Sequence, residues 1–205
     1  MMFIGALLVG LPTAFALALP GVVLPCSALS GTPCICPIGT DYSESVTTAV
    51  IGASASNVGY VTNDFFNPSW FGVDLYYVQG PDNFPELSIR EYNISTSVGT
   101  YLFSERLNFR FIFPDGSFEQ RYEQRGTIQY QSSNGSFSGN WVTLKGDRVF
   151  DNQTLVRFSN YACQTGHPID FAAFHEISLS NATNILKAAG MAAGASTTPV
   201  SAQLY

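Results

Sequence analysis

Residues 170–190 read DFAAFHEISLSNATNILKAAG. At about 100° per residue, the apolar side chains of this stretch fall on one stripe and most of its polar side chains fall on the opposite side. Asp170 is a good N-cap and Gly190 a good C-cap for such a helix. The stretch therefore predicts one amphipathic helix of about five turns, whose apolar stripe must be covered by another layer of the domain.

A long stretch of β pattern precedes this helix. From Val73 onward, alternating or β-branched runs are separated by clusters of Gly, Pro, Asn or Asp, which predicts a meander of about seven strands. The clearest hairpin joins FRFIF to SFEQRYEQ through Pro114-Asp115-Gly116, a sequence that favours a turn. Before the meander, we expect a strand that begins at Thr47 and a short aromatic helix that is stopped by Pro68.

The longest predicted strand has one strongly aromatic face. Period-two alternation places on it Tyr101, Phe103, Glu105, Leu107, Phe109, Phe111 and Phe113. In the partner strand, Phe118, Gln120, Tyr122 and Gln124 alternate with a second set that is fully charged and should face water. We expect the aromatic face to be the interior, and the candidate ligand-binding residues are Tyr101, Phe103, Phe109, Phe111, Tyr122, Trp141 and Phe174.

This order of elements resembles the helix-grip superfamily, which includes START lipid-transfer domains, birch-pollen-allergen relatives and polyketide cyclase-like proteins. The resemblance rests on the order and on three loose patterns, namely Phe65-x-x-Pro68-x-Trp70, Ser88-Ile89-Arg90-Glu91 and Ser104-Glu105-Arg106-Leu107. It implies an α+β fold in which a curved antiparallel sheet wraps around the long C-terminal helix. An apolar cavity between them would bind a small hydrophobic molecule.

Other architectures remain open for the same elements. A lipocalin-like or dirigent-like β-barrel would leave the final helix outside, and a cone-shaped barrel of the scytalone dehydratase type would need several helices before the sheet.

The first 23 residues are almost wholly apolar, and small residues in the pattern small-x-small occur at Ala14–Ala16 and at Ala16–Ala18. These features predict a secretory signal peptide. A membrane anchor is the alternative, but Pro12 and Pro20 leave fewer than the roughly 20 apolar residues that a spanning helix needs. We expect four segments along the chain: a signal peptide (1–18), a cysteine-containing segment (19–46), the helix-grip-like domain (47–190) and a disordered tail (191–205).

The four cysteines agree with secretion. Cys26, Cys34, Cys36 and Cys163 all follow the predicted signal, and an even count in a secretory context predicts two disulfides. Cys34 and Cys36 are too close in sequence for an easy bond to each other, so Cys163 should reach back to the amino-terminal segment. A metal site is the alternative, but one Cys-x-Cys pair without a nearby His is a poor zinc pattern, and we expect no cofactor.

Four Asn-x-Ser/Thr sequons predict N-glycosylation at the surface, at Asn93, Asn134, Asn152 and Asn181. The net charge is −6, and all nine Lys and Arg lie at or beyond Arg90. An acidic chain of this kind lacks the basic footprint that nucleic acid requires. We therefore expect a small hydrophobic ligand as partner, with no nucleic acid and no stable membrane insertion.

Two residues are candidates for catalysis, although no motif of an enzyme class is present. Glu105 interrupts the aromatic face, where a carboxylate must be paired or have its pKa raised, and it could act as an acid or a base. The alternatives are a β-bulge that turns it outward or an ion pair with an arginine of a neighbouring strand. His175 lies on the apolar stripe of the helix and could work with Glu105, or could be a half-buried histidine bonded to backbone.

Three functions are compatible with these features. The first is a secreted protein that holds a lipid, sterol or polyketide-like ligand in an internal cavity. The second is a cyclase or isomerase of a secondary-metabolite pathway that uses the same cavity. The third is a non-catalytic extracellular structural or interaction protein with a solid core.

Overall fold

The computed structural model describes residues 24–28, 30, 32–96, 99–129, 135–165 and 169–204. The predicted signal peptide and the sequon at Asn134 lie outside the described residues. Within them, no helix is long and apolar enough to cross a membrane.

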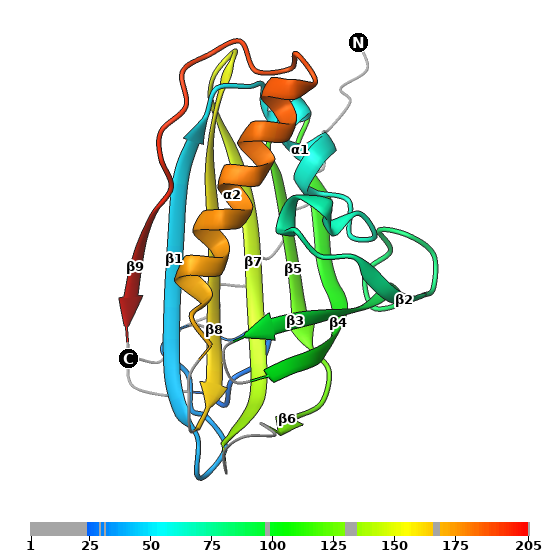
Figure 1. Cartoon of the computed structure of the whole chain (residues 1–205), viewed down its shortest axis with the longest axis vertical. Helices are drawn as coiled ribbons and strands as arrows, with labels where there is room; N and C mark the ends of the chain where they lie inside the picture. Colours follow the sequence, from blue (N-terminus) through cyan, green and yellow to red (C-terminus); the bar gives the residue numbers. More distant parts are fainter. Residues whose placement is uncertain are drawn as a thin grey trace, which may run out of the picture.

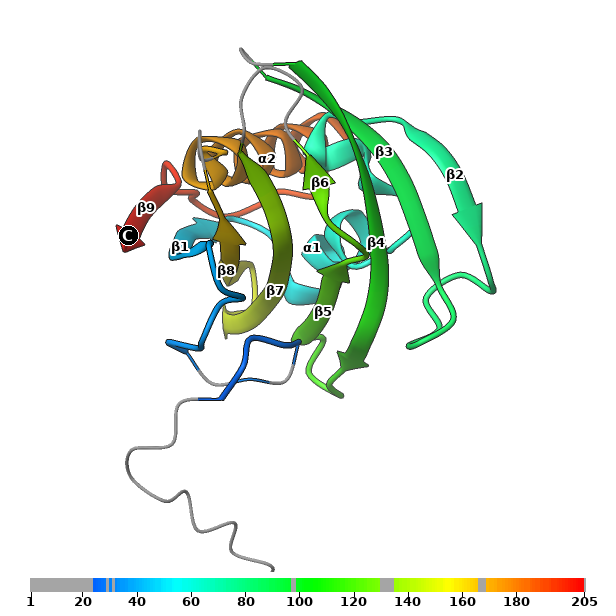
Figure 2. The same cartoon turned by 90° about the horizontal axis from the view of Figure 1, so that it is seen from below.

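The described strands form a single antiparallel sheet in the order β2-β3-β4-β5-β7-β8-β1-β9, with β6 paired to β7. The strands are β1 (Asp41–Ile51), β2 (Leu75–Gln79), β3 (Ile89–Thr96), β4 (Gly99–Ile112), β5 (Phe118–Gln124), β6 (Ile128–Gln129), β7 (Ser136–Phe150), β8 (Gln153–Gln164) and β9 (Val200–Leu204). The sheet is open, because β2 and β9 are separate edges, and it curves strongly (Figure 2). A closed barrel is thereby excluded.

The concave side of the sheet holds the helices (Figure 1). The predicted long helix is α2 (Phe171–Ala188), and Asp170 caps it by accepting a hydrogen bond from the backbone N–H of Ala173 at 2.9 Å. A short helix α1 (Ala55–Thr62) and a single 3₁₀ turn η1 (Pro68–Phe71) pack beside α2. The stripe predicted from the sequence is the buried one, and it includes His175, Leu179 and Leu186. This sheet gripping a C-terminal helix is the helix-grip fold.

The interior divides into two hydrophobic clusters. The upper cluster lies beneath α1, η1 and the middle of α2, and its largest members are Phe65, Trp70, Phe71, Tyr122 and Phe158. The lower cluster lies beneath the start of α2 and consists of Tyr92, Tyr101, Phe103, Phe137, Ala162 and Phe171. Both clusters lie on the concave face of the sheet.

A β-bulge corrects the predicted faces of the longest strand. The register of β4 against β5 shifts between Leu107 and Phe109, so the alternation changes phase at that point. Leu107 is buried, whereas Phe109 and Phe111 are 39% and 48% exposed. Phe109 faces Arg121, whose guanidinium carbon lies 5.4 Å from the ring centroid on the outer face. The prediction that Phe109 and Phe111 line the interior is therefore wrong.

Trp141 also lies on the outer face. It alternates with buried residues of β7 and stacks on Tyr161 of β8, with ring centroids 5.3 Å apart. Its predicted place in a cavity wall is wrong for the same kind of reason, because a register shift between Phe137 and Gly139 resets the alternation of β7.

The carboxyl-terminal tail is more ordered than the sequence suggests. Residues 200–204 form β9, which pairs with β1 from Glu44 to Thr48. Upstream, the backbone N–H of Gly194 donates to the carbonyl of Gly52 at 2.8 Å. The prediction of a disordered tail is wrong for this strand. The sheet also begins earlier than residue 47, since β1 starts at Asp41.

Candidate functional site

A buried ion pair lies in the middle of the concave face. Arg90 of β3 and Glu105 of β4 are direct cross-strand partners, and their side chains are 1% and 2% exposed. Arg90 Nη2 and Nε lie 2.7 Å and 2.8 Å from the same carboxylate oxygen, Oε2 of Glu105. The β4 bulge follows Glu105 and does not turn it outward. Of the interpretations open from the sequence, the structure shows the ion pair with a neighbouring arginine.

Aromatic rings surround this pair. The guanidinium carbon of Arg90 lies 4.3 Å from the ring centroid of Phe65, 4.6 Å from Tyr122, 4.9 Å from Phe71 and 5.6 Å from Tyr92. Arg90 Nη1 also donates to the backbone carbonyl of Phe65 at 3.0 Å. Cation–π contacts and this hydrogen bond offset part of the cost of burying the charge. We call these four rings with Arg90 and Glu105 the Arg90 cage.

The electrostatics of the cage favour fixed protonation states. Burial is the largest influence on Arg90 and would lower its pKa, but the Glu105 charge, the neighbouring Tyr122 and Tyr92, and the hydrogen bond to Glu105 together hold that pKa above its ordinary value. Burial, together with the Glu105 charge, raises the pKa values of Tyr92 and Tyr122. Both phenols therefore keep their protons at neutral pH, and the Tyr92 hydroxyl interacts with the Glu105 carboxylate.

His175 lies on α2 in an apolar environment. Its ring stacks on Phe158 with centroids 3.7 Å apart and is tilted against Phe171 and Phe174. Nδ1 has no hydrogen-bond partner among the described residues. Burial lowers the pKa of His175 to about 3, so the ring is neutral at physiological pH. No ion pair or hydrogen bond of the described residues joins it to Glu105, and their joint role in proton transfer stays a prediction.

The lower cluster is a stack of aromatic rings with an apolar rim. Ring centroids are 5.8 Å apart between Tyr92 and Phe103, and 5.6 Å apart both between Phe103 and Phe137 and between Phe137 and Phe171. Five half-buried aliphatic side chains from four segments pack against this stack, and we call them the rim: Val73, Leu75, Ile94, Ile128 and Ile169. Of the predicted ligand-binding residues, Tyr101, Phe103 and Tyr122 are buried in the interior, and Phe174 is half-buried against the upper cluster.

A row of buried polar side chains lies next to the lower cluster. Ser45 of β1 donates to Oδ1 of Asn160 on β8, and Nδ2 of Asn160 donates to Oδ1 of Asn140 on β7 at 3.0 Å. A void of about 10 Å³ lies between this row and Phe171, so the two features adjoin. We call the three residues the amide ladder. The amide ladder was not predicted from the sequence. Asn160 lies two residues after Phe158 on β8, and this period-two spacing could have placed both side chains on the inward face of the sheet.

The comparisons with known proteins agree with this geometry. A family model described as a START domain matches residues 42–204. This chain belongs to the START domain family. No curated protein matches the chain.

Three solved structures illustrate the likeness. A norcoclaurine synthase point mutant from Thalictrum flavum, in complex with a transition-state analogue, has a TM-score of 0.54 at 8% identity and covers 75% of this chain and 99% of its own. The ZhuI aromatase/cyclase of Streptomyces sp. R1128 has a TM-score of 0.46 at 12% identity over 72% of this chain and 84% of its own. Ara h 8.0201 has a TM-score of 0.49 at 10% identity over 73% and 99%. At these identities the likeness concerns the fold alone.

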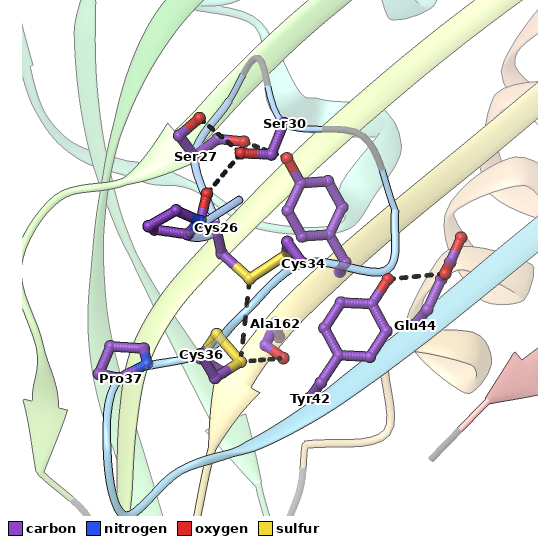
Figure 3. Close-up of a disulfide and its surroundings, with 12 residues drawn as sticks. Cys26, Ser27, Ser30, Cys34, Cys36, Pro37, Tyr42, Glu44 and Ala162 are labelled. Atoms are coloured by element: carbon purple, nitrogen blue, oxygen red, sulfur yellow. Dashed lines mark hydrogen bonds between the residues drawn. A yellow bond between two sulfur atoms is a disulfide. The ribbon is translucent and has the colours of Figure 1, made fainter. Parts of the chain in front are cut away.

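In this START domain, one disulfide attaches an amino-terminal segment to the sheet, and a second disulfide lies beside it within that segment (Figure 3). Cys26 is bonded to Cys34, and Cys36 is bonded to Cys163 of β8. The prediction that Cys163 reaches back to this segment is confirmed. The sulfurs of Cys26, Cys36 and Cys163 all lie within 4.8 Å of one another, but each is in a disulfide and is not a thiolate that could bind a metal.

The sequons differ in accessibility. Asn93 on β3 and Asn152 in the β7–β8 turn are exposed. Asn181 on α2 is half-buried and lies next to Gly72. Glycosylation at these positions stays a prediction, and the first two offer the freer access.

Proposed function

We propose that this protein is secreted and binds a small hydrophobic molecule on the concave side of its sheet, at the lower cluster. The observation that carries the proposal is the rim. Five half-buried aliphatic side chains from four segments pack against a stack of buried aromatic rings. Partly exposed apolar side chains that pack against a buried aromatic interior are a common setting for a ligand site.

Binding at this place has a clear driving force. A ligand that entered between Ile94, Ile128 and Ile169 would cover their exposed apolar surface, which is worth about 25 cal/mol for each Å² removed from water. Its flat or ring-shaped body would lie over the rim, with the buried rings of Phe103 and Phe137 beneath it. The family's known preference for hydrophobic ligands supports this assignment.

The polar groups nearby favour a neutral ligand. Among the described residues of the lower cluster and the amide ladder, none is charged, and Glu44, which lines the void between them, accepts a hydrogen bond from the Tyr42 hydroxyl. Arg90 and Glu105 neutralise each other, so an ionised ligand would bring a buried charge without a counter-charge, which is costly. A ligand with hydroxyl or carbonyl groups fits better, because the amides of Asn140 and Asn160 can exchange hydrogen bonds with them.

Secretion is part of the same proposal. The apolar amino-terminal stretch, the two disulfides and the exposed sequons at Asn93 and Asn152 support it independently. Disulfides persist mainly in oxidising compartments. The catalytic alternative has less support, because Glu105 is held in an ion pair and the lowered pKa of His175 makes that ring a weak base.

The proposal is tested by Nile red binding to protein secreted from a eukaryotic host. Ile128→Trp places a large ring in the rim, whereas Ile177→Trp makes the same change on the solvent side of α2, where the side chain is 59% exposed. We expect Ile128→Trp to weaken binding by about tenfold or more and Ile177→Trp to leave it unchanged. Equal binding by both variants, or no binding by the parent protein, would contradict the proposal.

A further inference from the structure

The two disulfides come into near contact with each other on the outer face of the sheet. The sulfur of Cys26 lies 3.9 Å from the sulfur of Cys36, although these atoms belong to different bonds (Figure 3). Cys26 and Cys36 are half-buried, whereas Cys34 is 6% exposed and Cys163 is fully buried. The two sulfurs in near contact are thus also the two more accessible ones.

Disulfides exchange when a thiolate attacks a sulfur of another disulfide, so the rate depends on whether the two can meet. Opening the Cys26–Cys34 bond would leave a Cys26 sulfur already beside Cys36. We propose that these four cysteines form a thiol–disulfide exchange site whose co-substrate is a small-molecule thiol. In the exchange, Cys36 changes its disulfide partner from Cys163 to Cys26. The exchange does not depend on ligand binding in the interior.

The chemistry balances as follows. Two equivalents of the small thiol reduce the Cys26–Cys34 bond, which yields one small-molecule disulfide and two cysteine thiols. Cys26 loses its proton to solvent and attacks the sulfur of Cys36. The Cys26–Cys36 bond forms, the Cys36–Cys163 bond breaks, and its electron pair leaves on Cys163, which takes up a proton from solvent.

The exchange changes what holds the amino-terminal segment. In the starting state, residues 24–40 are joined covalently to β8 through Cys163. After exchange, the segment keeps an internal bridge but has no covalent bond to β8. Its remaining anchors include the hydrogen bond that the Tyr161 hydroxyl donates to the carbonyl of Ser27. Exchange would therefore release the segment and expose a thiol on the outer face of the sheet.

A matched pair of variants tests the site in the full secreted chain. Cys34→Ser leaves Cys26 as the free thiol, and Cys26→Ser leaves Cys34, which is too close in sequence to Cys36 to bond with it easily. Each protein is quenched with acid, unfolded and treated with N-ethylmaleimide, and the labelled cysteine is found by peptide mass spectrometry. We expect label on Cys163 in Cys34→Ser, and label on Cys34 alone in Cys26→Ser.

Label confined to Cys26 in the Cys34→Ser variant would overturn the proposal. If that variant does not fold, the parent protein is titrated with dithiothreitol below one equivalent and labelled in the same way. Label at Cys163 together with a Cys26–Cys36 linked peptide supports the exchange. Label at Cys26 and Cys34 with an intact Cys36–Cys163 peptide contradicts it.

Discussion

Replacing Glu105 by Gln would leave the Arg90 guanidinium buried without its counter-charge. Both side chains are almost completely buried, and Arg90 makes its two short contacts with a single oxygen of Glu105. Removing one partner of such a pair costs about 3–5 kcal/mol, because the remaining charge cannot be resolvated. At a urea m-value of roughly 2 kcal/mol/M, the unfolding midpoint should fall by about 2 M. The assay is equilibrium unfolding in urea, followed by tryptophan fluorescence with the disulfides intact.

The matched control for this prediction lies on the outer face of the same sheet. Glu123 pairs with Arg106, whose side chain is 39% exposed, so Glu123→Gln should cost only about 0–1 kcal/mol. Replacing both members of the buried pair, Arg90→Met with Glu105→Leu, should recover most of the loss, because no unpaired charge remains. Equal midpoints for Glu105→Gln and Glu123→Gln would refute the reasoning about the cage.

Three further predictions concern stability. Burial lowers the pKa of His175 to about 3, so below pH 6.5 the folded state binds fewer protons than the unfolded state. The free energy of unfolding should therefore fall by up to about 1.4 kcal/mol for each pH unit between pH 6.5 and 3. Urea unfolding of His175→Phe at several pH values should lack this part of the pH dependence. Phe103→Ala should lower the free energy of unfolding in urea by about 3–5 kcal/mol, because this ring is buried. Phe109→Ala should lower it by less than about 1 kcal/mol, because the bulge leaves this ring partly exposed on the outer face. The double change Cys36→Ser with Cys163→Ser opens a loop spanning 127 residues and should cost about 4–5 kcal/mol by the same measurement, with a loss near zero contradicting the attachment.

Strong periodicity explains which parts of the fold could be predicted from the sequence. The helix at residues 170–190 and its buried stripe follow from local spacing and from the caps, and the hairpin at residues 109–124 follows from its turn residues. These features are encoded within a few residues of one another. The helix-grip arrangement then follows, because only the concave face of the sheet can cover the helix stripe.

Features that depend on pairing between distant strands were not predictable in this way. The alternation of aromatic residues continues unbroken through Phe109 and Phe111, and only the register against β5 reveals the bulge. Arg90 stood in one of the patterns that carried the resemblance, but its contact with Glu105 requires the β3–β4 register. The strand at residues 200–204 has little local β pattern and forms because the edge of β1 offers it hydrogen-bond partners.

The central claim is that the lower cluster holds a small neutral molecule. The most direct measurement is native mass spectrometry of the protein as secreted by a eukaryotic host, followed by organic extraction and identification of what is released. We expect one discrete mass above that of the glycosylated chain in the parent protein and in Ile177→Trp, and its loss in Ile128→Trp. A native mass that equals the glycosylated chain alone, with nothing extracted, would contradict the claim.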